Sequence, residues 1–93
     1  MGINFKKNVY MKITIKVLGT GCSKCKTLEN LTKEVVSENS YNAEVIKIDD
    51  IVDIMNYGIM ATPGLVINEK VVISGRVPSK EEIKTQIEKY INE

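Results

Sequence analysis

The chain has 93 residues, which is enough for one small domain. Thirteen lysine and arginine residues stand against twelve aspartate and glutamate residues, a net charge of +1, so the chain lacks the concentrated basic surface that nucleic-acid binding requires. Its longest apolar stretches are only a few residues, far short of the roughly 20 that a membrane-spanning helix needs. We therefore expect a globular domain that binds neither nucleic acid nor membrane.

Apolar residues recur along the chain with the spacings of alternating strands and helices. Alternation over residues 12–18 is typical of a strand, and the uninterrupted apolar run over residues 65–67 is typical of an interior strand. Ser79 and Glu82 form a capping box for the last of three amphipathic helices. The predicted elements are a strand over 12–18, a helix from about 23 to 38, a strand over 43–48, a short helix from about 51 to 57, strands over 65–67 and 71–73, and a final helix after Ser79.

These elements predict a single α/β domain with the order β-α-β-α-β-β-α. Residues 1–10 precede the regular pattern and are predicted to be a leader outside the core, so the domain is expected over residues 11–93. Met11 is itself a candidate initiator. No internal repeat or linker divides the chain.

The chain contains two cysteines and no histidine. Two cysteines cannot build the disulfide framework of a small secreted domain. The basic residues Lys6 and Lys7 are followed by an alternating strand pattern, not by the apolar core of a secretion signal. We therefore expect a cytoplasmic protein, in which a close cysteine pair is more often catalytic or metal-binding than structural.

The most informative motif is Gly21-Cys22-Ser23-Lys24-Cys25, which lies between the first strand and the first helix. A cysteine at a helix start meets unpaired N–H groups and the positive end of the helix dipole, and both favour the thiolate. Such positions lower the pKa of a cysteine from about 8.5 to roughly 3.5–7.5. Cys25 lies one turn further in, within disulfide distance. We expect Cys22 to be the catalytic nucleophile and Cys25 the shielded, resolving catalytic thiol.

Gly21, Ser23 and Lys24 are candidate modulators of this pair because they surround it in sequence. Lys24 adds a modest positive charge between the thiols; its alternative role is that of a solvated helix side chain. For the pair itself, the alternatives are two inert core thiols or half of a metal site. The remaining sequence has to decide among them.

Thr62-Pro63 stands at the start of the apolar strand over 65–67, where a proline's missing N–H does no harm. With this dipeptide, the C-x-x-C motif after the first strand, the element order and Gly75 at the end of the hairpin, the chain resembles the thioredoxin superfamily. The similarity is greatest to its small, glutaredoxin-sized redox-active disulfide proteins, and it covers about residues 11–92.

The resemblance implies a thioredoxin-like fold with a four-stranded mixed sheet flanked by helices, and a thiol–disulfide oxidoreductase without a prosthetic group. It implies that the bond before Pro63 is cis, that Pro63 faces the cysteine pair, and that Thr62 offers backbone hydrogen bonds to an extended substrate. The expected partners are disulfide-containing proteins, with a thioredoxin-reductase-like flavoprotein or glutathione as the reductant.

Two positions depart from the pattern of typical thioredoxins. Gly21 occupies the place of a tryptophan before the first cysteine, and the strand over 15–18 carries no buried acid to handle protons for Cys25. Lys16 is the one titratable residue of that stretch, and we expect it to point to solvent. Deprotonation of Cys25 would then depend on water.

Two other functions compete with thiol–disulfide exchange. Gly19-Thr20-Gly21 followed by the cysteine pair is similar to the loop of heavy-metal-associated domains, and two thiolates suit Cu(I). Those domains carry a methionine where this chain has Thr20, and they end in a strand. The third reading is a non-catalytic interaction domain, which the intact cysteine pair disfavours.

Overall fold

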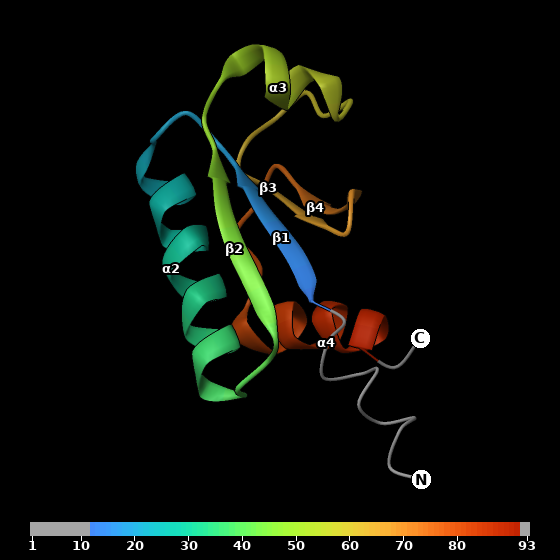
Figure 1. The fold of residues 1–93 in the computed structure, drawn as a ribbon. Helices are drawn as coiled ribbons and strands as arrows, with labels where there is room; N and C mark the ends of the chain where they lie inside the picture. The colour runs from blue at the N-terminus through green and yellow to red at the C-terminus, as the bar shows by residue number, and fades with distance from the viewer. Residues whose placement is uncertain (1–11, 92–93) are drawn as a thin grey trace, which may run out of the picture.

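The computed structural model describes residues 12–91, and these form four strands and three helices (Figure 1). The elements are β1 (Ile13–Leu18), α2 (Ser23–Glu38), β2 (Ala43–Ile48), α3 (Ile51–Asn56), β3 (Gly64–Ile67), β4 (Lys70–Ser74) and α4 (Lys80–Ile91). The predicted order β-α-β-α-β-β-α is confirmed. The predicted leader over residues 1–10 lies outside the described residues.

The four strands form one mixed sheet in the order β2-β1-β3-β4. β1 and β2 run parallel because α2 carries the chain back between them, whereas β1–β3 and β3–β4 are antiparallel. Leu18, the last residue of β1, is paired with Ile48 of β2 on one side and with Gly64 of β3 on the other. The loops that follow β1 and precede β3 therefore meet at the same end of the sheet.

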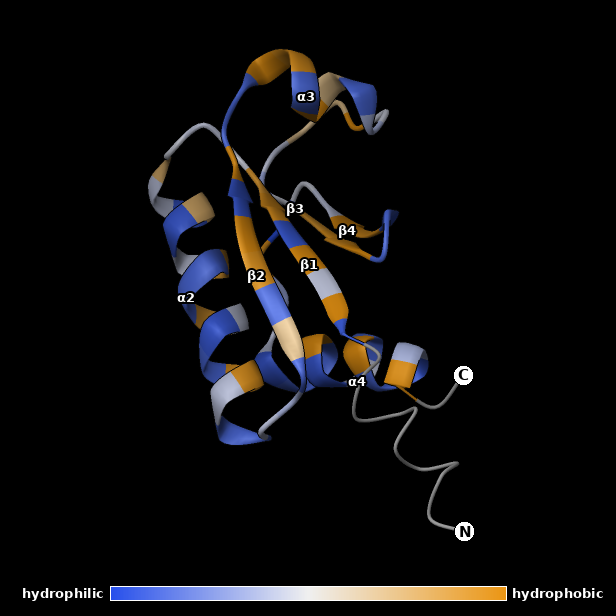
Figure 2. Cartoon of the chain, viewed as in Figure 1, coloured by the Kyte–Doolittle hydropathy of each residue, from blue (hydrophilic) through white to orange (hydrophobic). Residues whose placement is uncertain are grey.

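The larger hydrophobic core lies between the sheet and the two longer helices. The alternating side chains of β1 that include Ile15 and Val17 point to this face and meet Leu28 of α2 and Ile83 of α4. Figure 2 shows apolar colour along the strands beside α2. The buried members of this cluster are Ile13, Ile15, Val17, Leu28, Val35, Leu65, Ile67, Ile73, Ile83 and Ile87.

The smaller core lies on the opposite face, under α3. Its buried members are Leu18, Ile54 and Val66, with Ile48, Tyr57 and Ile59 packed around them. Asp50 caps α3, because its Oδ1 accepts hydrogen bonds from the N–H groups of Val52 (2.8 Å) and Asp53 (3.2 Å).

The last helix begins as predicted. Ser79 Oγ accepts a hydrogen bond from the N–H of Glu82 at 3.2 Å, which is one half of a capping box. The carboxylate of Glu82 pairs with the guanidinium of Arg76 just before the helix. These contacts set the direction in which α4 leaves the hairpin and crosses the sheet beside α2 (Figure 1).

Candidate active site

Cys22 is the N-cap of α2. Its backbone is extended (φ −68°, ψ 166°), and its Sγ accepts a hydrogen bond from the N–H of Cys25 at 3.3 Å. The sulfur therefore occupies the position that an oxygen holds in an ordinary N-cap residue. Both cysteines are free thiols; Cys22 is exposed and Cys25 is buried, with 4% of its surface accessible. The predicted asymmetry of exposure is confirmed.

The pKa of Cys22 is lowered below the ordinary value of a thiol by hydrogen bonding to Cys25. The side chain of Cys25 has the larger effect and its backbone N–H the smaller. The backbone N–H of Lys24 acts in the same direction. The two backbone N–H groups are unpaired donors of the helix start, so the geometry that caps α2 adds to the effect of the Cys25 side chain and favours the thiolate.

Two glycines shape the loop that carries Cys22. Gly21 has φ +96°, a left-handed conformation that favours glycine. Gly19 is buried against Cys25, and a Cβ on Gly19 would collide with Cys25 Sγ and come within 2.7 Å of its Cβ. The absence of a side chain at Gly19 thus lets the thiol of Cys25 pack directly against the end of β1.

Thr62 and Pro63 lie at the end of the sheet that carries the cysteines, since β3 begins opposite Leu18. The Thr62–Pro63 peptide bond is cis, as the resemblance implied. Pro63 is buried, and its carbonyl accepts a hydrogen bond from the N–H of Gly75 at 2.8 Å. Thr62 is exposed, and within residues 12–91 its backbone N–H and C=O have no hydrogen-bond partner.

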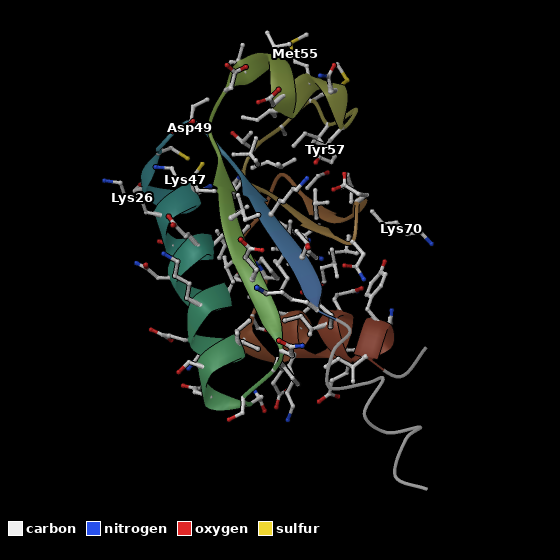
Figure 3. The ribbon with its side chains drawn as sticks, viewed as in Figure 1. Lys26, Lys47, Asp49, Met55, Tyr57 and Lys70 are labelled. Carbon is white, nitrogen blue, oxygen red and sulfur yellow. The ribbon has the colours of Figure 1, made fainter. Side chains whose placement is uncertain are left out.

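A shallow hollow opens beside Cys25, between the first turns of α2 and the ends of β1 and β2. Its lining residues are Val17, Gly19, Gly21, Cys25, Lys26, Glu29 and Lys47. Figure 3 shows Lys26 on α2 and Lys47 on β2 at this end of the molecule. Sequence reasoning missed Glu29 and Lys47. Two signals were present: Glu29 follows Cys25 by four residues on a helix, and Lys47 has the strand parity of Ala43 and Val45.

The prediction that Lys16 points to solvent is wrong. Lys16 lies on the α3 face of β1 with only 20% of its side chain exposed. Its Nζ is 2.6 Å from Glu69 Oε2 and 2.8 Å from the hydroxyl of Tyr57, and these bonds raise the pKa of Lys16. Cys25 lies on the opposite face, so Lys16 takes no part in the chemistry of the pair.

The two residues between the cysteines, Ser23 and Lys24, are exposed on the first turn of α2. Their modulating role, like that of Gly21, stays a prediction. Within residues 12–91, no three or more histidine, cysteine, aspartate or glutamate side chains are grouped so that they could hold a metal ion.

Residues 13–88 match the model of the family described as Thioredoxin domain. The chain belongs to this thioredoxin family. A thioredoxin of Methanocaldococcus jannaschii is 37% identical over 89% of this chain and 95% of its own length. A thioredoxin of Methanothermobacter thermautotrophicus is 44% identical over 75% of this chain and 91% of its own length. The solution structure of oxidised thioredoxin from Plasmodium falciparum shares the fold, with a TM-score of 0.61 at 18% identity over 98% of this chain and 92% of that one.

This thioredoxin-family chain is a thiol–disulfide oxidoreductase, as its homologues and its Cys22–Cys25 pair show. The copper-carrier alternative is not supported, because the chain matches thioredoxin homologues and has the thioredoxin order of elements. No helix among the described residues is long and apolar enough to cross a membrane.

Proposed function

We propose that Cys22 is the nucleophile of this oxidoreductase and Cys25 its resolving thiol. The observation that carries the assignment is the position of Cys22 Sγ: it is exposed at the start of α2 and accepts the N–H of Cys25 at 3.3 Å. The pKa of Cys22 is lowered there, so a larger share of it is thiolate, the form that attacks disulfides. Cys25 is buried one turn below and reaches only what is bonded to Cys22.

The reaction proceeds in two exchanges. Cys22 thiolate attacks one sulfur of the substrate disulfide; a Cys22–substrate disulfide forms, and the other substrate sulfur leaves as thiolate. Cys25 then loses its proton and attacks Cys22 Sγ, which forms the Cys22–Cys25 disulfide and releases the second substrate thiolate. Two electrons have passed from the chain to the substrate.

The extended substrate pairs with Thr62. The backbone N–H and C=O of Thr62 have no partner in the described part of the chain, and they lie at the end of the sheet where Cys22 is exposed. A substrate strand that pairs there as in β-augmentation would bring its disulfide toward Cys22. Pro63, held by Gly75, positions Thr62 for this contact.

Thioredoxins work on disulfide-containing substrates and are returned to the dithiol by a reductase. For this chain we propose protein disulfides as substrates, a thioredoxin-reductase-like flavoprotein or glutathione as reductant, and no cofactor beyond the Cys22–Cys25 disulfide. A cytoplasmic location accords with two cysteines in a redox-active pair and no structural disulfide.

Variants of the two cysteines test these roles. Cys25→Ser should form a mixed disulfide with a protein substrate and hold it, because the resolving step is lost, whereas Cys22→Ser should form none. In the reduced wild-type protein, Cys22 should react with iodoacetamide at a pH well below the pH at which a free thiol becomes reactive. Cys25 should react slowly. Equal alkylation rates at the two thiols, or mixed disulfides trapped at Cys25, would contradict the assignment.

A further inference from the structure

The resolving step needs a group that takes up a proton, and the sequence supplies few candidates. The chain has no histidine. Val17 of β1 and Gly19, just after that strand, line the hollow beside Cys25 and carry no charge. Lys16 is bound to Glu69 on the other face of the sheet. Cys25 is 4% exposed, so bulk water has little access to its thiol. The side chains that line the hollow beside Cys25 are therefore the candidates for the proton acceptor.

Glu29 is the carboxylate that lines this hollow. It follows Cys25 by four residues on α2, which places the two side chains on the same side of the helix one turn apart. Its side chain is 20% exposed, against 55% for Glu34 further along the same helix, so Glu29 is the more buried of the two carboxylates. Glu29 Oε2 lies 3.1 Å from Lys33 Nζ in an i,i+4 ion pair along the helix.

The other charged groups at the hollow are cations. Lys47 belongs to β2 and is paired in register with Val17, so both side chains face the same side of the sheet as α2. Lys26, on α2, is exposed. Asp49 lies further along, just beyond the end of β2 (Figure 3), and does not line the hollow. The hollow beside the buried Cys25 is thus lined by one acidic residue and two basic residues.

We propose that Glu29 is the proton acceptor for Cys25. The inference rests on the proposed roles of Cys22 and Cys25. As Cys25 attacks the mixed disulfide, its S–H proton passes to the Glu29 carboxylate, the new Cys22–Cys25 S–S bond forms, and the substrate thiolate leaves with the electron pair of the old bond. Glu29 then releases the proton to that thiolate or to water. The same carboxyl returns a proton to Cys25 when the disulfide is reduced.

A purely electrostatic role for Glu29 predicts the opposite effect of its removal. A fixed negative charge disfavours a thiolate beside it, so replacing Glu29 by a neutral residue would make Cys25 a better nucleophile and speed the resolving step. A proton acceptor predicts a slower step. The sign of the change therefore separates the two roles.

The experiment uses an aromatic disulfide that releases a coloured thiolate, mixed with the reduced full chain in a stopped-flow instrument. The first release follows attack by Cys22 and depends on reagent concentration; the second follows attack by Cys25 and does not. We expect Glu29→Gln to leave the rate of the first phase within about twofold of the wild type. The rate of the second phase should fall by about 100-fold at pH 7, the lower end of the usual range for general acid–base catalysis. The rate of the second phase in Glu29→Gln should also rise more steeply with pH than it does in the wild type, because hydroxide must now take the proton.

Two variants are the controls. Glu34→Gln removes the same charge from the same helix away from the hollow, and Lys33→Gln removes the ion pair of Glu29 but keeps its carboxylate. Both should retain the wild-type second phase and its pH profile. Glu29→Asp should recover part of the rate lost in Glu29→Gln.

A second phase in Glu29→Gln that is unchanged or faster, or a parallel fall of both phases, overturns the proposal. A slow second phase in Lys33→Gln equal to that of Glu29→Gln also overturns it, because the ion pair and not proton transfer would then be responsible. Failure of the proposed function looks different: the wild-type chain would show no concentration-independent second release, whatever residue stands at position 29.

Discussion

On the face of the sheet covered by α2 and α4, ten buried residues of the described chain form one continuous cluster, whereas on the face covered by α3 the buried cluster has three. The helix that carries the cysteines is anchored in the larger cluster through Leu28 and Val35. The six-residue helix α3 has one buried residue, Ile54, and exposes the apolar side chains of Ile51 and Val52. Figure 2 shows this apolar colour at the start of α3.

The α3 face compensates with polar contacts. Lys16, Tyr57 and Glu69 form a closed set of hydrogen bonds that links β1, the end of α3 and the hairpin between β3 and β4. On the other face, the polar residues around Cys25 line an open hollow. The cysteine pair thus lies on the face with the larger buried core, whereas a polar network supports the face with the smaller one.

Removing side chains from the two cores should give the largest difference. Leu28→Ala opens a cavity in the large cluster, where Leu28 is completely buried, and should lower the free energy of unfolding by about 4 kcal/mol. Ile54→Ala should cost about 2 kcal/mol, because the thin layer around α3 can collapse onto the space. Urea unfolding of both variants measures this, and equal losses would contradict the comparison.

Adding a methyl group to each face should again affect the α2 face more than the α3 face, by a smaller amount. Gly19→Ala would collide with the side chain of Cys25 and should cost about 1–3 kcal/mol. Gly64→Ala brings its Cβ within 2.9 Å of Ile59 Cδ1, the end of a flexible side chain, and should change stability by about 1 kcal/mol or less in either direction. Urea unfolding midpoints test the pair, and a greater loss in Gly64→Ala would reverse the expected ranking of the faces.

The start of α3 offers a third test. Asp50→Ala removes two hydrogen bonds from the helix cap and should cost about 1 kcal/mol. The neighbouring Asp49→Ala, which removes a carboxylate outside the cap, is the matched control and should change stability little. Hydrogen exchange should show faster exchange confined to α3 in Asp50→Ala. Equal protection of α3 in both variants would show that the cap is dispensable on this face.

The smallest expected effect is on acid stability. Hydrogen bonds from Lys16 and Tyr57 lower the pKa of Glu69 from its usual value near 4.5. In the unfolded chain Glu69 binds its proton at a higher pH, so its contribution is complete above about pH 4.5 and is lost as pH falls through the lowered value in the folded state. Unfolding midpoints measured between pH 2 and 7 should fall less steeply in Glu69→Gln than in the wild type.

The matched variant on the other face is Glu82→Gln. Arg76 lowers the pKa of Glu82, so this variant should also flatten the acid limb of the stability profile. An acid limb that is unchanged in Glu69→Gln would show that the polar network under α3 contributes nothing measurable, and the compensation inferred for that face would be wrong.

Local sequence was sufficient for the elements and for the cysteine pair. The order of strands and helices depends on apolar spacing, and the place of Cys22 at a helix start depends on residues within one turn of it. Both are short-range properties, so they could be predicted and are confirmed by the structure. The interior position of β3 followed in the same way from its uninterrupted apolar run.

Tertiary neighbours could not be predicted in this way. Lys16 was expected in solvent because the strand pattern shows only that it faces away from the large core; its partner Glu69 is 53 residues further along the chain. No local motif marks Glu29 in the sequence. It lines the same hollow as Cys25 and Lys47 because α2 packs beside β2, and that packing joins residues that are distant in the sequence.

Because the sulfur of Cys22 is itself the cap of α2, the redox state of the protein changes the hydrogen bond of a backbone amide. Each time Cys22 Sγ passes from thiolate to disulfide, the N–H of Cys25 exchanges a charged acceptor for a weak neutral one. The nuclear magnetic resonance signal of that single amide should then move with every turnover, and it serves as a built-in reporter that needs no label or dye.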